Sequence, residues 1–163
     1  MNYATIKYPD IANGEGVRVS LFVSGCRRNC KGCFNKEAQD FSYGQKFTWE
    51  TVHELEELLK DKNIEGLSIL GGDPLEPENR LEIVSLCAYL KHNLPGKSIW
   101  LWTGYSWENV KDLGLMHHID ILVDGPFIED LKDLRLKWRG SSNQRVISVA
   151  ESLSTGEVIE YDV

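Results

Sequence analysis

The strongest constraint on the fold is an alternation of short apolar segments with segments whose apolar residues recur at helical spacing. Five segments have the length and composition of strands, at residues 17–23, 67–70, 99–103, 119–123 and 146–149. Three helical segments lie between them, at residues 49–62, 80–93 and 106–113. Strands joined through helices pair in parallel, so the pattern predicts an α/β fold with a mainly parallel sheet and helical crossovers. The units are too few for eight strands, so the sheet should be open or partly barrelled, with a last edge strand at residues 158–161.

The chain length and the net charge limit the kinds of protein that this chain can be. A chain of 163 residues can bury one core without staples, so we expect a single domain over residues 1–163. The formal net charge of −7 gives no overall basic surface for nucleic acid or anionic lipid. The N-terminal residues lack the apolar run of a signal peptide, and no stretch approaches the ~20 apolar residues of a membrane span. We therefore expect a cytoplasmic protein whose partners include neither nucleic acid nor a membrane.

Three thiols stand within eight residues, at Cys26, Cys30 and Cys33, directly after the first expected strand. Strand side chains alternate between faces, so the thiols can converge only if this segment curls as a loop. Convergent thiolates bind soft metals, and zinc ions and iron–sulfur clusters are both held in this way. A structural zinc ion usually takes four ligands, so three thiols imply an open position. The cysteines alone support zinc and iron–sulfur about equally.

The basic residues between the thiols and the location of the fourth cysteine bear on how a metal could be held. Arg27, Arg28 and Lys31 lie between the three thiols, and they are expected to lower the thiol pKa values unless they are simply solvated. Cys87 falls on the apolar stripe of the 80–93 helix. We expect it to be a buried thiol rather than a fourth ligand.

The next expected strand runs into Gly71-Gly72-Asp73-Pro74. Two glycines at the C-terminal end of a strand indicate that backbone comes close to another group, and in α/β folds ligands bind at this edge of the sheet. Asp73 also suits an ordinary turn before proline, so these four residues alone are weak evidence for a ligand site. A further polar segment, residues 138–145, is either a solvated loop or the mouth of a pocket.

The spacing of Cys26, Cys30 and Cys33 resembles the signature of the radical S-adenosylmethionine (SAM) enzymes, and the Gly-Gly-Asp-Pro turn strengthens the match. The combination resembles the activating enzymes of glycyl-radical enzymes, in particular the small activases of anaerobic ribonucleoside-triphosphate reductases. Two positions depart from the wider superfamily, since Gly32 replaces a common aromatic residue and Asp73 replaces the usual glutamate; both suit these activases. Matching stretches run across nearly the whole chain, at residues 13–18, 25, 32–35, 102–105, 120–127 and 139–145.

The resemblance implies a reduced, partial (β/α) barrel of the radical SAM type that binds a 4Fe-4S cluster and SAM. The three motif cysteines would hold three irons, and the amino and carboxylate groups of SAM would chelate the fourth. Gly71, Gly72, Asp73 and Pro74 would meet the methionyl amino group largely through backbone atoms, with Thr103 near the same cofactor. How the short Asp73 side chain meets the cofactor is left open. No catalytic residue beyond the cluster and cofactor is implied.

The implied activity is reductive cleavage of SAM followed by removal of a glycine α-hydrogen, which leaves a glycyl radical on the large subunit of the reductase. A flavodoxin-like protein would donate the electron. Because the substrate is a protein, the pocket must admit a peptide, and Arg139, Asn143 and Arg145 are candidates for its mouth. The sequence leaves open the oligomeric state, including a homodimer, and the position of the target glycine.

Two other interpretations remain at this point. One is a radical SAM enzyme that acts on a small molecule, similar to the deazapurine synthases. The other is a non-catalytic zinc module in which Cys87 or a histidine supplies the fourth ligand.

Overall fold

The computed structural model describes residues 1–33 and 36–162, so residues 34 and 35 of the matching stretch 32–35 lie outside the described part. Within it, strands form one sheet in the order β3-β1-β2-β4-β5-β6-β7. The central strands β2, β4, β5 and β6 are parallel, whereas β1, β3 and β7 pair antiparallel with their neighbours. The strand bounds are β1 Asn2–Asp10, β2 Arg18–Val23, β3 Gln45–Lys46, β4 Gly66–Gly71, β5 Ser98–Trp102, β6 Ile121–Asp124 and β7 Arg145–Ser148.

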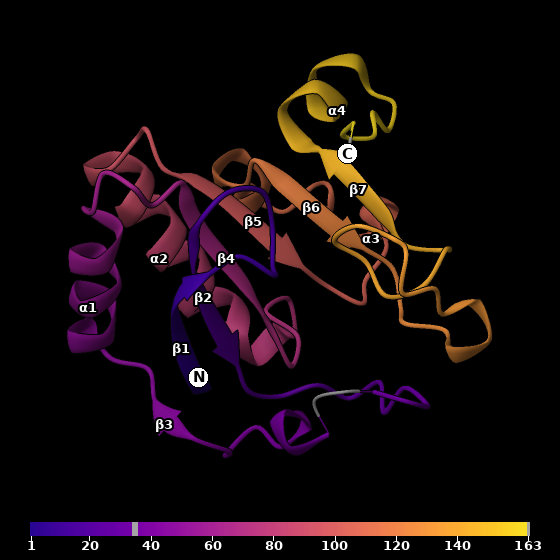
Figure 1. Cartoon of the computed structure of the whole chain (residues 1–163), viewed down its shortest axis with the longest axis horizontal. Coiled ribbons are helices and arrows are strands. Elements are labelled where there is room, and N and C mark those ends of the chain that lie inside the picture. The colour runs from indigo at the N-terminus through magenta and orange to yellow at the C-terminus, as the bar shows by residue number, and fades with distance from the viewer. Residues whose placement is uncertain (34–35, 163) are drawn as a thin grey trace.

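Helical crossovers connect the parallel strands, as the sequence predicted. The helix α1 (Trp49–Leu59) precedes β4, α2 (Pro77–Asn93) joins β4 to β5, and α3 (Trp107–Val110) with η2 (Gly114–His118) joins β5 to β6. The remaining helical turns are η1 (Glu37–Gln39), η3 (Glu129–Leu131) and α4 (Val149–Thr155). Figure 1 shows α1 and α2 on the same side of the sheet. This confirms the α/β fold with parallel core strands, arranged as in a partial (β/α) barrel.

Several boundaries differ from the prediction, each for a local reason. The strand β1 was not predicted, because most of its side chains are half-buried or exposed and show no regular alternation. Thr48 is the N-cap of α1 as expected, but the helix ends at Leu59, three residues early. The expected edge strand at residues 158–161 is reduced to a bridge between Glu160 and Ile147. That residues 1–163 form one domain stays a prediction.

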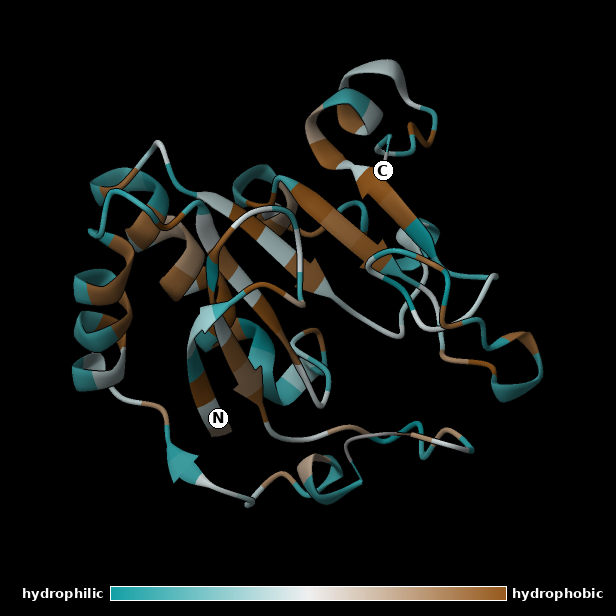
Figure 2. Ribbon diagram, in the orientation of Figure 1, coloured by the Kyte–Doolittle hydropathy of each residue, from teal (hydrophilic) through white to brown (hydrophobic). Residues whose placement is uncertain are grey.

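The two faces of the parallel sheet differ in character. Along β5, Ile99 and Leu101 enter the core beneath α1 and α2, while Trp100 and Trp102 point to the opposite face. Strand alternation explains this separation, because successive side chains leave a strand on opposite sides. Figure 2 shows the apolar colouring concentrated on the parallel strands and on parts of the helices near them. The face away from the helices, here called the open face, is therefore available for a site.

A buried cation ties three strands together on the open face. Arg18 is 1% exposed. Its guanidinium donates hydrogen bonds to neutral oxygens, namely Ser68 Oγ (2.7 Å), Leu67 O (3.0 Å), Ser98 Oγ (3.0 Å), Ser98 O (3.1 Å) and Glu15 O (3.1 Å). Burial lowers the pKa of Arg18 to about 10. The charge stays in the interior because backbone and hydroxyl acceptors take the place of water.

Among the described residues, no helix combines the length and apolar character needed to cross a bilayer.

Replacing Arg18 by methionine should lower the free energy of unfolding by about 3 kcal/mol, because buried acceptors on β4 and β5 would lose their donors. Urea unfolding followed by circular dichroism measures the change. Arg135→Met is the matched control, since its side chain is 90% exposed, and it should cost less than about 1 kcal/mol. Equal midpoints for wild type and Arg18→Met would contradict this role.

Candidate functional site

A cavity of about 450 Å³ opens on the open face at the C-terminal ends of the parallel strands. One wall contains the cysteine segment, defined as residues 25–33, which supplies Cys26, Cys30 and Cys33 to the lining. The turn after β4 adds Gly71, Gly72 and Asp73, and the end of β5 adds Thr103. The structure thus brings together residues that the sequence placed in three separate segments.

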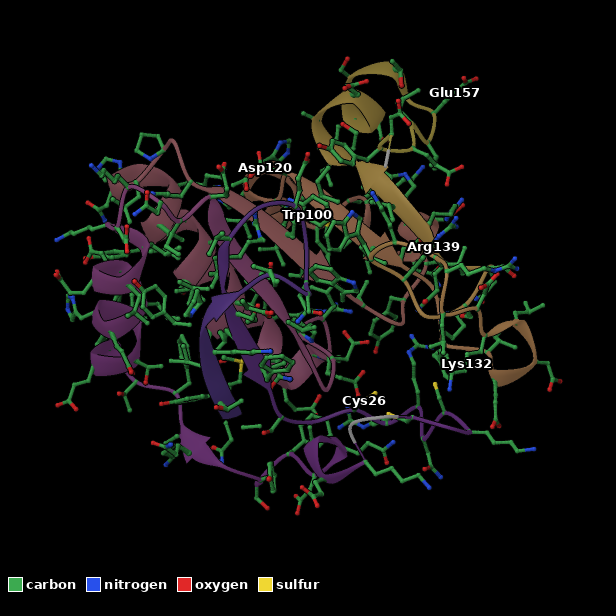
Figure 3. The ribbon with its side chains drawn as sticks, in the orientation of Figure 1. Cys26, Trp100, Asp120, Lys132, Arg139 and Glu157 are labelled. Atoms are coloured by element: carbon green, nitrogen blue, oxygen red, sulfur yellow. The ribbon has the colours of Figure 1, made fainter. Side chains whose placement is uncertain are left out.

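The facing wall is the rim segment, defined as residues 125–144, which follows β6. Lys132, Leu134, Trp138 and Arg139 are among its lining residues. Figure 3 shows Cys26 on one side of this space, with Lys132 and Arg139 on the rim side. The cavity therefore lies between two segments that are about one hundred residues apart in the sequence.

The cysteine segment curls as a loop, as predicted. Gly25 N–H donates to Ala38 O (2.6 Å), and Cys26 N–H donates to Gln39 O (3.1 Å). The outer part turns through a hydrogen bond from Cys33 N–H to Cys30 O (3.1 Å). Gly32 has a φ of +77°, a left-handed value that suits glycine. A loop rather than a strand allows all three side chains to reach one cavity.

The three motif thiols are free and half-buried. Within residues 1–33 and 36–162, no three His, Cys, Asp or Glu side chains are gathered closely enough to hold one metal ion. The thiols therefore line one cavity without meeting at a point. Three free thiols around a space of this size fit a cluster, which is larger than a single ion and is held by separate thiolates.

The expectation that neighbouring cations lower the thiol pKa values is wrong for Cys26. Burial raises the pKa of Cys26, and the nearby carboxylates of Asp73 and Glu76 raise it further. The two arginines after Cys26 form ion pairs with carboxylates instead of facing the thiol. Arg27 pairs with Glu76 and Glu78, and Arg28 lies 3.8 Å from Asp73. The sequence showed the basic residues but not the acids that neutralise them.

Cys87 is fully buried in the core beneath the sheet, as predicted. Burial raises the pKa of its thiol to about 12. A thiol held neutral in an apolar core is a poor metal ligand, because the thiolate is the form that binds metal.

The two glycines at the end of β4, Gly71 and Gly72, are required by close backbone packing. A Cβ on Gly71 would lie 2.6 Å from the Val23 carbonyl oxygen, and one on Gly72 would lie 2.7 Å from the Gly25 carbonyl oxygen. Gly72 N–H donates to Val23 O, and Asp73 N–H donates to Gly25 O, both at 2.8 Å. The close approach that the glycines indicated is therefore an approach of Gly71 to the end of β2 and of Gly72 to the start of the cysteine segment. Contact of the turn with a cofactor stays a prediction, as does contact by Pro74, which is buried outside the cavity lining.

Asp73 uses its carboxylate within the protein. The side chain is 2% exposed. It accepts hydrogen bonds from Leu75 N–H (2.9 Å), Thr103 Oγ1 (2.8 Å) and Gly104 N–H (2.9 Å). Burial raises the pKa of Asp73, although these hydrogen bonds and the Arg28 guanidinium oppose the rise. The carboxylate joins the end of β4 to the end of β5, which explains how a short aspartate serves at this position.

Arg28 and Tyr105 extend the same wall. The guanidinium carbon of Arg28 lies 4.4 Å from the centre of the Tyr105 ring, and Arg28 lines the cavity. Stacking on an aromatic ring restrains an arginine without using its hydrogen-bond donors. The wall therefore places the Arg28 guanidinium, paired with Asp73, in the cavity lining beside the motif cysteines.

The three candidate peptide-binding residues have different environments. Arg139 lines the cavity, and its Nη1 donates to Gln144 O (2.6 Å). Asn143 donates to Pro126 O (2.7 Å), and neither Asn143 nor Arg145 is part of the cavity lining. Their contact with a peptide stays a prediction.

Arg145 is the first residue of β7, and two carboxylates bind its guanidinium. Its Nη2 donates to Asp124 Oδ2 (2.6 Å) and to Glu108 Oε2 (2.8 Å). These bonds connect β6, β7 and α3, so Arg145 has a structural partner set that the sequence did not reveal.

Comparison with known proteins adds independent information. Residues 12–147 match a family described as a 4Fe-4S single cluster domain. The chain is 46% identical over 148 residues to the anaerobic ribonucleoside-triphosphate reductase-activating protein of Enterobacteria phage T4, an alignment that covers 91% of this chain and 94% of that protein. It is 45% identical over 150 residues to the protein of that name from Escherichia coli, with coverage of 90% and 97%. The corresponding Vibrio cholerae protein is 44% identical over 148 residues, with coverage of 88% and 96%.

Asp73→Asn should lower the free energy of unfolding by about 2 kcal/mol, because the amide NH₂ would face a buried donor that the carboxylate now satisfies. Chemical denaturation measures this loss. Asp130→Asn, at an exposed carboxylate, should change stability by less than about 0.5 kcal/mol. If the two variants were equally stable, the proposed link between β4 and β5 would be wrong.

Proposed function

Because the chain belongs to the family of anaerobic ribonucleoside-triphosphate reductase-activating proteins, we propose that it activates an anaerobic ribonucleotide reductase by generating a glycyl radical on it. The observation that carries this proposal is the shared cavity of the three motif cysteines and the Gly-Gly-Asp turn. The protein is a radical SAM activating enzyme of the 4Fe-4S type.

Cys26, Cys30 and Cys33 would hold the cluster, and they would leave one iron open for the amino and carboxylate groups of SAM. When bound, the cluster and SAM supply the one-electron chemistry that removes a hydrogen atom from a glycine α-carbon. The donor set fits, because three free thiols line the cavity and the fourth cysteine is buried away in the core.

The chain's own residues would orient the cofactor. The N–H of Gly72 is already bonded to Val23 O at the end of β2, and the N–H of Asp73 to Gly25 O in the cysteine segment, so an amino group would be met by carbonyl oxygens of the turn. Arg28, stacked on Tyr105 beside the cysteines, offers a guanidinium to a carboxylate. Thr103 contributes indirectly, because its hydroxyl is held by Asp73.

The rim segment would meet the protein substrate. Arg139 and Trp138 line the cavity, and Leu134 is 87% exposed beside it. A peptide that enters from this side would place its glycine between the rim and the cofactor wall while excluding water. The large subunit of the reductase is the proposed partner, and a flavodoxin-like protein is the proposed electron donor. A homodimer and a cytoplasmic location stay predictions.

The alternatives are less well supported. Full burial of Cys87 argues against a zinc module that uses it as the fourth ligand. A small-molecule substrate would not account for similarity to reductase-activating proteins over about nine tenths of the chain.

The experiment is to mix anaerobic, cluster-loaded protein with reductase, a reductant and SAM, and to record the electron paramagnetic resonance spectrum of the reductase. The proposal predicts a glycyl radical doublet and the onset of ribonucleotide reduction. S-adenosylhomocysteine, which lacks the sulfonium methyl group, is the control and should give neither. Cleavage of SAM without a radical on the reductase would contradict the proposed partner and favour a small-molecule substrate.

A further inference from the structure

Glu76 is a buried carboxylate that the proposed reaction does not use. It is 2% exposed and occupies the N-cap position of α2, without a capping hydrogen bond from its side chain. Its Oε2 accepts a hydrogen bond from the Arg27 backbone N–H (2.9 Å) and another from Arg27 Nη1 (3.3 Å). Its Oε1 accepts from the Tyr105 hydroxyl (2.6 Å). One carboxylate therefore joins the cysteine segment, the turn after β4 and the turn after β5.

The bond to Arg27 fixes the backbone at the first motif cysteine. Arg27 directly follows Cys26, so its N–H belongs to the peptide unit that contains the Cys26 carbonyl group. The preceding peptide unit is held by the bond from Cys26 N–H to Gln39 O. Both peptide units of Cys26 are thus anchored. In the described part of the chain, the backbone bond at the other two cysteines runs from Cys33 N–H to Cys30 O.

The position of Glu76 also matters electrostatically. A carboxylate in a water-excluded place acts on its surroundings more strongly than an exposed one, because the effective dielectric constant is lower. Glu78 offers a direct comparison, since it binds the same Arg27 guanidinium but is 43% exposed. A buried negative charge beside a cluster ligand opposes the addition of an electron to the cluster, as hydrogen bonding and charge generally tune such potentials.

We propose that Glu76 is a positioning residue of the cluster site, which fixes the backbone of Cys26 and keeps the reduction potential of the bound cluster low. The proposal rests on the proposed function in one respect, namely that Cys26 is a cluster ligand. Glu76 acts through Arg27 and through its charge, without touching the cluster.

The first test compares Glu76→Gln with Glu78→Gln in cluster-loaded protein by a redox titration monitored by electron paramagnetic resonance. Each substitution removes one negative charge from the partners of Arg27. Only Glu76→Gln should raise the midpoint potential, while Glu78→Gln should match wild type. An unchanged potential in Glu76→Gln, or an equal rise in both variants, would overturn the electrostatic part.

The second test uses the protein without a cluster and follows amide hydrogen exchange at Arg27. Glu76→Ala should speed exchange at this amide, and Glu76→Gln, whose side-chain oxygen still accepts, should restore most of the protection. Unchanged exchange in Glu76→Ala would overturn the positioning part. This test also separates the two proposals, because a wild-type chain that takes up no 4Fe-4S cluster would refute the proposed function while the exchange result would still decide the role of Glu76.

Discussion

The hydrogen bonds that continue the β2–β4 pairing beyond the strands are the contact on which the site depends. Gly72 N–H to Val23 O and Asp73 N–H to Gly25 O join the end of β2 and the start of the cysteine segment to the turn after β4. Only glycine permits this approach at positions 71 and 72, since a Cβ on Gly71 or Gly72 would overlap backbone atoms. The turn and the first motif cysteine are therefore placed side by side by the sheet itself.

Charge pairing completes this arrangement. Asp73 and Glu76 lie in one turn, and each connects a different part of the surrounding wall: Asp73 holds the end of β5, and Glu76 holds the cysteine segment and Tyr105. Arg27 and Arg28, which follow the first motif cysteine, pair with these acids and with Glu78, and burial together with Asp73 and Glu76 raises the pKa of the Cys26 thiol. The cavity thus has a rigid wall built on strand ends and a facing wall built on the rim segment, which suits a cofactor held in place and a protein substrate that must come and go.

Much of this could be predicted from the sequence, and the remainder depends on tertiary contacts. The parallel strands, the crossover helices, the cysteine loop and the buried Cys87 follow from periodicity and spacing. The strand β1 could not be predicted, because most of its side chains are half-buried or exposed and show little alternation. The roles of Glu76 and Arg145 could not be predicted, because each depends on a partner that the fold brings from more than fifteen residues away. The two glycines were noticed for the correct physical reason, but the group that they approach is the chain's own backbone.

We propose that Cys26, Cys30 and Cys33 hold a 4Fe-4S cluster with one iron open to SAM. The most direct measurement is the electron paramagnetic resonance spectrum of anaerobically iron-reconstituted, chemically reduced protein, with and without SAM. We expect a reduced 4Fe-4S signal that changes shape with SAM in wild type and in Cys87→Ala, and that is absent in Cys30→Ala. Stoichiometric zinc with no such signal would contradict it.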